Sequence, residues 1–246
     1  MTSSGYDAGT AAAYREAREI PREGLPAWRQ AIAEEAGLAP GMTVLDVGAG
    51  TGAFATAFHD WFGVRVVAVE PAVAMRELIP AHPAVEVREG RAEALPVADA
   101  SADAAWLGSV VHHLDDLAAA ARELRRALRP GAPVLIRNSF PGRSERDLRI
   151  RFFPETAESV AGYPTVDEVT TAFATAGFRR TALRALPQQS APTLADFARR
   201  LRREADTKLR ALDDAAYARG LARLHAAASA SPEEPATSWM DLLVLR

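Results

Sequence analysis

One stretch of the chain, VLDVGAGTGAFATAF at residues 44–58, restricts the possible folds more than any other. It passes from a short apolar run through Asp46 into glycines at 48, 50 and 52, and then into a helical pattern. Glycine loses more backbone entropy on ordering than other residues, so three alternate glycines indicate a ligand that comes close to the main chain. The helix that follows offers free N–H groups and the positive end of its dipole. The stretch therefore predicts a strand–turn–helix unit with a ligand at the carboxyl end of the strand.

Strand and helix patterns alternate along the first 140 residues. Short apolar runs predict strands at 43–47, 64–69, 84–88, 102–108 and 133–138, and amphipathic runs predict helices at 52–62, 71–80 and 115–128. This alternation is typical of a parallel sheet covered on both faces by right-handed crossovers. Further along, the patterns predict a helix at 165–176 ending at Gly177, a strand at 178–187, two helices within 193–230 and a last strand in WMDLLVLR.

Composition excludes several classes of protein. The 246 residues suit a single domain, and a net charge of −3 argues against a nucleic-acid-binding surface. There is no cysteine, which excludes disulfides, thiolate metal sites and cysteine nucleophiles. We find no signal-peptide pattern and no run long enough for a membrane helix, so we expect a cytoplasmic protein without membrane or nucleic-acid partners. Nothing in the sequence predicts the oligomeric state.

A carboxylate follows the second predicted strand. Glu70 ends VVAVE, about 20 residues after the first glycine, which is the spacing at which an acidic residue binds a ribose in nucleoside sites. Glycine loop and acid together predict a nucleoside ligand. Read strictly, the loop also fits the dinucleotide form G-x-G-x-x-A, so at this point NAD(P) remains open.

Four motifs in order resemble those of one family. DVGAGTG, VEP, EGRAEALPVADASADAAWLGSVVHHL and RPGAPVLIR are similar to class I S-adenosylmethionine-dependent methyltransferases, most closely the ubiquinone/menaquinone-type and small-molecule branches. The resemblance covers about residues 38–138. It implies an α/β, Rossmann-like doubly wound fold with a mostly parallel seven-stranded sheet, an antiparallel last strand and a helical substrate lid. It also implies S-adenosylmethionine as cofactor.

The resemblance assigns roles to matching positions. Asp46 and the glycine loop would hold the methionine end of the cofactor, Glu70 the ribose hydroxyls, and Ser109 would lie beside the sulfonium. By the same resemblance, the adenine would lie against Ala92 and Glu93, and an N-terminal stretch with Tyr14 and Arg18 would cover the cofactor. The complete set of cofactor-binding residues expected is Tyr14, Arg18, Asp46, Gly48, Ala49, Gly50, Gly52, Glu70, Pro71, Ala92, Glu93 and Ser109.

Two observations favour S-adenosylmethionine over NAD(P). An acid at position 46 suits a ligand ammonium and would be out of place beside a pyrophosphate. The chain also lacks a Tyr-x-x-x-Lys pair, because Lys208 is its only lysine and lies in a late predicted helix. The function we expect is methyl transfer to O, N or C of a small molecule. The alternatives are a protein that binds the cofactor without methyl transfer, of cyclase or regulatory type, and a nicotinamide-dependent oxidoreductase.

Two histidines follow the fourth predicted strand, in SVVHHL. A histidine titrates near neutral pH, so His112 or His113 is a candidate general base for an acceptor that must lose a proton. The alternative is that they pack against, or cap, the helix that starts near Asp115. Asp115 and Asp116 themselves suit a helix N-terminus better than a metal site, and we expect no metal.

The segment after the fifth strand mixes aromatic residues with arginines. Such a mixture suits a pocket for an aromatic or acidic small molecule, although an exposed loop with its phenylalanines packed inward explains it equally well. The candidate substrate residues are Arg137, Phe140, Arg143, Phe152, Phe153 and Tyr163. As parts of one domain over 1–246, we expect a helical cover at 1–40, a cofactor-binding core at 41–139, substrate-side and helical insertions at 140–237, and a final strand at 238–246.

Overall fold

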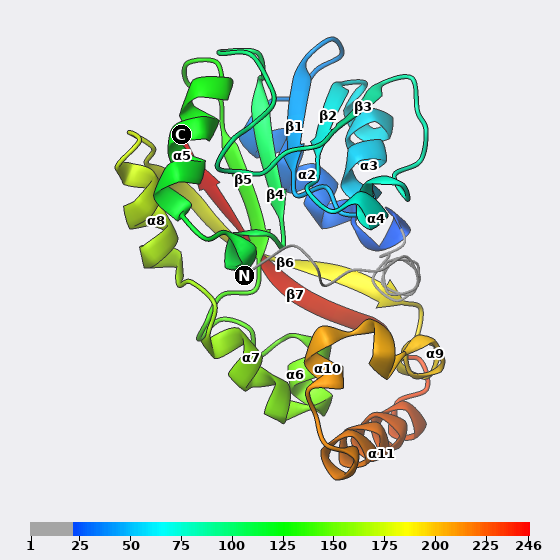
Figure 1. Cartoon of the computed structure of the whole chain (residues 1–246). Helices are drawn as coiled ribbons and strands as arrows, with labels where there is room; N and C mark the ends of the chain where they lie inside the picture. Colours follow the sequence, from blue (N-terminus) through cyan, green and yellow to red (C-terminus); the bar gives the residue numbers. More distant parts are fainter. Residues whose placement is uncertain (1–21) are drawn as a thin grey trace.

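The computed structural model describes residues 22–246, apart from the side chains of residues 205 and 207. Tyr14 and Arg18, two of the expected cofactor residues, lie outside the described residues. A seven-stranded sheet in the order β3-β2-β1-β4-β5-β7-β6 forms the centre of the molecule (Figure 1). Its strands are β1 (Thr43–Val47), β2 (Arg65–Val69), β3 (Val85–Arg88), β4 (Ala104–Gly108), β5 (Val134–Asn138), β6 (Arg180–Ala191) and β7 (Ala236–Leu245).

Strand direction confirms the predicted Rossmann-like α/β fold. β1 to β5 are parallel, and β7 pairs antiparallel with both β5 and β6. Helices cover both faces. One face carries α2 (Pro26–Ala36), α3 (Ala53–Phe62) and the short α4 (Val73–Arg76), and the other carries α5 (Leu117–Ala127) and α8 (Val166–Ala174). Short 3-10 helices add η1 (Arg22–Gly24), η2 (Val111–His113), η3 (Pro154–Thr156) and η4 (Arg203–Ala205).

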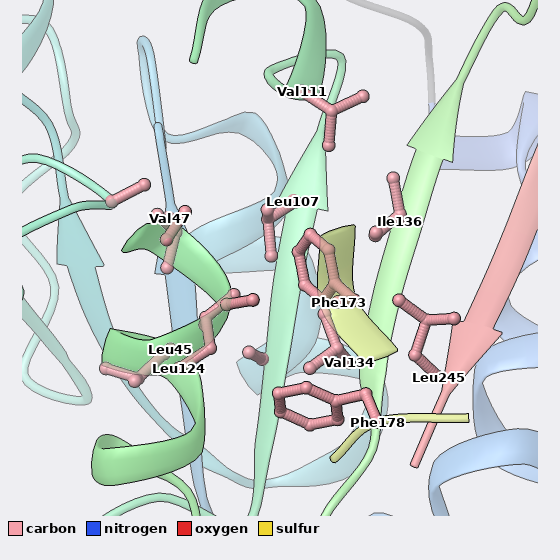
Figure 2. Packing of buried hydrophobic residues seen from close by; sticks show 14 of the residues in the cluster. Leu45, Val47, Leu107, Val111, Leu124, Val134, Ile136, Phe173, Phe178 and Leu245 are labelled. Carbon is pink, nitrogen blue, oxygen red and sulfur yellow. The ribbon is translucent and has the colours of Figure 1, made fainter. Parts of the chain in front are cut away.

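Each sheet face has its own hydrophobic core. Leu45, Val47 and Ile136 pack under α5 and α8, where Figure 2 shows them with Leu124 and Phe173. The residues that alternate with them, such as Val44 and Trp106, pack under α2 and α3. This alternation is the period-2 pattern of a strand buried on both faces, and it fixes which side chains share a face.

A third hydrophobic cluster lies beyond the sheet. The register pairs Asn138, the last residue of β5, with Asp241, so the first half of β7 and the second half of β6 extend past the carboxyl end of β5. This two-stranded extension carries a group of helices that we call the helical cap (Figure 1). The cap comprises α6 (Leu148–Phe152), α7 (Ala157–Ala161), α9 (Leu194–Arg200), α10 (Thr207–Arg210) and α11 (Asp214–Ala230).

The cores correct three predicted substrate contacts. Phe140 and Phe153 are both 0% exposed, Phe140 in the core under α5 and α8 and Phe153 in the helical cap. Phe152 is buried in the same cap cluster. The prediction that these phenylalanines line the substrate pocket is wrong, because burial in the two cores gains more than exposure to a pocket would.

One predicted helix is much shorter in the structure. The segment predicted as a helix over 71–80 is helical only from Val73 to Arg76. Pro80 disfavours helical geometry at Ile79. The guanidinium of Arg76 also donates to the carbonyl oxygens of Glu70 and Pro71, which anchors the short helix to the end of β2. Within residues 22–246, no helix has both the length and the apolar character needed to cross a bilayer.

Candidate active site

The glycine loop lies at the carboxyl end of β1. Gly48, Gly50 and Gly52 all have positive φ, at 70°, 56° and 81°, a region that side chains disfavour. A Cβ at Gly48 would overlap Val110, and one at Gly52 would lie 2.7 Å from Ile79 Cγ2. A Cβ added at Gly50 would meet no described atom within 4 Å, so the side of this glycine where a side chain would stand is open to a ligand. Ala49 packs at the edge of the α2–α3 core.

Glu70 ties this loop to the next one. Its side chain is 7% exposed, and its carboxylate accepts from the backbone N–H of Gly50 and of Ala72, each at 2.9 Å. Pro71 follows with its carbonyl bound to Arg76. The carboxylate therefore stands at the junction of the loops after β1 and β2, the position from which a ribose can be bound.

Asp46 is the most unusual acid of the site. It is 2% exposed, and no described residue donates to its Oδ2. Burial, together with the nearby negative charge of Glu70, raises the pKa of Asp46 to about 7. A buried oxygen of this kind needs a donor, and a bound ammonium group would supply one and restore the charged form.

The residues expected near the adenine differ from each other in exposure. Ala92 is buried in the α5–α8 core, and Glu93 is half-buried. The side chain of Ala92 therefore faces the protein, so only its main chain can face a ligand. No contact of Glu93 with the loops after β1 or β2 is present in the hydrogen-bond network of the described residues, and its role stays a prediction.

At the ends of β4 and β5 a histidine is held in one orientation. His112 Nδ1 lies 3.1 Å from Asn138 Oδ1, and Asn138 Nδ2 donates to the carbonyl of Ser139 at 2.9 Å. The second bond orients the amide so that its oxygen faces the imidazole. Nδ1 must therefore carry the proton, and Nε2 keeps the lone pair in the neutral ring. The Tyr163 ring stacks on His112 at 4.0 Å, and Lys208 Nζ lies 5.7 Å from the centre of the Tyr163 ring.

The remaining candidate residues after β4 and β5 have other partners than His112 has. His113 is exposed and touches the His112 ring at 4.1 Å. Arg143 forms a two-point ion pair with the buried Asp241 of β7, at 2.8 and 2.9 Å, which raises the pKa of the arginine. It thus joins the loop after β5 to the sheet, and its place in a substrate pocket stays a prediction. Arg137 donates to Ser109 Oγ at 3.0 Å.

Comparisons with known proteins agree with this geometry. Residues 45–136 match the family of the methyltransferase domain. The demethylmenaquinone methyltransferase of Renibacterium salmoninarum is 32% identical over 110 residues, which cover 44% of this chain and 46% of that protein. The chain thus matches about half the length of this relative. Residues 45–136 therefore correspond to a methyltransferase domain.

Solved structures share the fold over most of this chain. A candidate methyltransferase from an antibiotic biosynthesis pathway of Anabaena variabilis superimposes with a TM-score of 0.69 at 22% identity, over 94% of this chain and 99% of that one. The [4+2]-cyclase SpnF superimposes with a TM-score of 0.59 at 18% identity, over 89% of this chain and 79% of that one. These similarities show that this chain shares the fold of the two proteins.

Sequence reasoning missed two polar residues of the methyltransferase domain that orient others. Asn138 fixes the His112 ring, and Gln188 of β6 accepts from Arg137. Asn138 could have been found, because it is the last residue of a predicted strand and so lies at the same edge of the sheet as the glycine loop. Gln188 carries no local signal, since only the antiparallel pairing of β6 brings it to the site.

A group with metal-ligand chemistry lies far from this site. Among the described residues, His59, Asp60 and His82 place potential ligand atoms within 4.8 Å of one another. They sit at the end of α3 and before β3, which is the opposite edge of the sheet from the methyltransferase site. Asp60 pairs with Arg22, and His82 Nδ1 accepts from the N–H of Ala84, so both already have partners of their own.

Proposed function

We propose that the protein transfers a methyl group from S-adenosylmethionine to an O, N or C atom of a small-molecule acceptor. The observation that carries the proposal is the pair of buried acids beside the open glycine loop. Asp46 suits an ammonium and Glu70 suits ribose hydroxyls, and the methionine and ribose parts of this cofactor present those two groups. A dinucleotide would instead bring the negative charge of its pyrophosphate to the loop, next to two carboxylates.

The bound cofactor would supply a methyl group already activated by its sulfonium. The protein then has to align the acceptor with that methyl group and, for a hydroxyl or amine, remove a proton. His112 suits the second task, because Asn138 holds the proton on Nδ1 and leaves Nε2 as the base. An oriented base favours methyl transfer as the function. A protein that only binds the cofactor would need no such base.

The helical cap supports a small acceptor. It covers the carboxyl edge of the sheet near α6, α7 and α10 (Figure 1). Tyr163 and Lys208 bring a ring and a cation from this side toward His112. Enclosure of the acceptor by the cap would suit a molecule of modest size.

The test begins with ligand binding. Calorimetry should show binding of S-adenosylhomocysteine, and a metabolite panel incubated with S-adenosylmethionine should release S-adenosylhomocysteine with at least one acceptor. Glu70→Ala should weaken S-adenosylhomocysteine at least tenfold, because a charged partner of the ribose and the support of Gly50 are lost together. Binding of NADH without S-adenosylhomocysteine, or unchanged affinity in Glu70→Ala, would contradict the proposal.

A further inference from the structure

Lys208 is the only lysine in a chain whose lysines and arginines together number 29. Every other member of that set is an arginine, so this position stands out. The residue belongs to α10 of the helical cap and is only 8% exposed. An ammonium is a compact charge with three hydrogen-bond donors, whereas a guanidinium is a flat fork. A buried lysine in an arginine-rich chain therefore indicates a place where a compact cation is needed.

A buried acid fixes the backbone from which this lysine projects. Asp206 is 2% exposed, and its Oδ1 accepts from the backbone N–H of Lys208 at 3.0 Å and from that of Leu209 at 3.4 Å. Its Oδ2 accepts from Nε of Arg149 in α6. Asp206 thus caps α10, and Arg149 balances its charge. The ammonium of Lys208 is a positive charge in addition to this ion pair.

One aromatic ring connects the ammonium to the candidate base. The Tyr163 ring stacks on the His112 ring, with 4.0 Å between the ring centres and 12° between the ring planes. Lys208 Nζ lies 5.7 Å from the centre of the same Tyr163 ring. The ammonium is therefore no further from the imidazole centre than the sum of these two separations. A small molecule with a ring or a short chain between its two functional groups spans such a distance.

The base and the cation suit different parts of one acceptor. His112 suits a nucleophile that must lose a proton, and an ammonium suits a group with negatively charged oxygens. We propose that Lys208 binds an anionic group of the methyl acceptor, a carboxylate or a phosphate, while the nucleophile lies at His112. The acceptor is then a small acid. This assignment rests on the proposed function, and with three donors the ammonium can bind an anion and keep its other contacts.

Burial makes this contact selective. The attraction between two charges is stronger where water is mostly excluded than at the surface, and hydrogen bonds between charged groups are stronger than those between neutral ones. A neutral acceptor of the same shape would offer the buried ammonium a weaker partner and would lose that attraction. Lys208 should therefore favour an acid over its uncharged analogue, which is the property that the test measures.

The single lysine gives the test a direct readout. Protein grown with ¹³C,¹⁵N-labelled lysine carries one labelled side chain, so its NMR signal reports Lys208 alone. With S-adenosylhomocysteine present, the protein is titrated at constant ionic strength with benzoate, with phenyl phosphate and with benzamide, the uncharged match of benzoate. We expect the Lys208 and His112 ring signals to shift and saturate with at least one of the two anions, and benzamide to bind at least tenfold more weakly. The anion that binds identifies the acidic group as carboxylate or phosphate.

Variants show whether the ammonium is responsible. The His112 ring signal, assigned by its loss in His112→Ala, follows binding in proteins without Lys208. Lys208→Met should weaken the anion at least tenfold, Lys208→Arg should retain part of the affinity, and Arg210→Met should stay within twofold. Arg210 is the matched control, because it is an exposed cation of the same helix.

Three results would overturn the proposal: no shift of the Lys208 signal with either anion, equal affinity for benzamide, or a shift at Lys208 without one at His112. Failure of the wild type to bind S-adenosylhomocysteine would instead contradict the proposed function. In that case, a saturable response to the anion that Lys208→Met removes would still establish the anion site.

Discussion

At the scale of single residues, the site depends on groups whose charge is set by their surroundings. Asp46 is the clearest case, because its pKa of about 7 lies well above the ordinary value of 3.8. In the folded protein without ligand, the carboxyl keeps its proton at pH values where the unfolded chain has lost it. Its contribution therefore makes the free energy of unfolding fall as pH rises from about 4 to about 7.

Ligand binding should reverse this dependence. An ammonium beside Asp46 favours the carboxylate, so binding of S-adenosylhomocysteine below pH 7 should release a proton from Asp46, and affinity should rise as pH increases from 5.5 to 7.5. Calorimetry in buffers of different ionisation enthalpy counts that proton. Asp46→Asn should bind weakly at all these pH values and release none. A pH-independent affinity in the wild type would contradict the placement of the ammonium at Asp46.

His112 and His113 should differ in their effect on turnover. His112 is oriented by Asn138 and stacked by Tyr163, whereas His113 is exposed. For a protic acceptor, His112→Ala should lower kcat by about 10²–10⁴-fold, the usual contribution of a general base, and His113→Ala by much less. Equal, full activity in both variants would mean that alignment alone carries the reaction.

Asn138 acts through His112, so a change of charge tests it. Asn138→Asp keeps an acceptor for Nδ1–H but adds a negative charge, which should raise the pKa of His112. The acid limb of the kcat/KM profile should therefore move to higher pH, while Asn138→Ala should mainly lower kcat. A purely structural role would leave the position of the limb unchanged in Asn138→Asp.

At the scale of elements, the bounds of the first five strands could be predicted closely from the sequence. The packing of the helical cap could not. The first five strands lie within two residues of the predicted bounds, because each is a short apolar run that ends at a glycine, a turn or a polar residue. Phe152 and Phe153 were ambiguous because their burial depends on partners as distant as Leu194, Leu224 and Ala236. A local pattern contains no information about such partners.

The cap also shows how closely its helices pack. Gly220 of α11 lies against the Phe153 ring, and a Cβ there would overlap that ring. Gly220→Ala should therefore destabilise the protein by about 1–3 kcal/mol through overpacking, despite the better helix propensity of alanine. Thermal unfolding measures the effect. Gly162→Ala is the control, because nothing described lies within 4 Å of its added Cβ, and a loss of stability equal to that of Gly220→Ala would refute the packing argument.

At the scale of the whole molecule, cofactor binding should stabilise both cores together. The glycine loop joins β1 to α3, and Glu70 ties this loop to the end of β2. S-adenosylhomocysteine at 100 times its Kd should raise the free energy of unfolding by about 2.7 kcal/mol, visible as a higher Tm, and NADH at the same concentration should not. A shift with NADH alone would favour the nicotinamide alternative.

The place of β7 in the sheet has a consequence for the order in which the chain can fold. β7 is made after every other strand, yet it lies between β5 and β6 and supplies half of the extension that carries the cap. Until it is synthesised, β5 and β6 are two open sheet edges, and Asp241 is not there to bind Arg143. A nascent chain can therefore complete its glycine loop early, whereas the edges of β5 and β6 stay open to pairing with other chains until β7 is made.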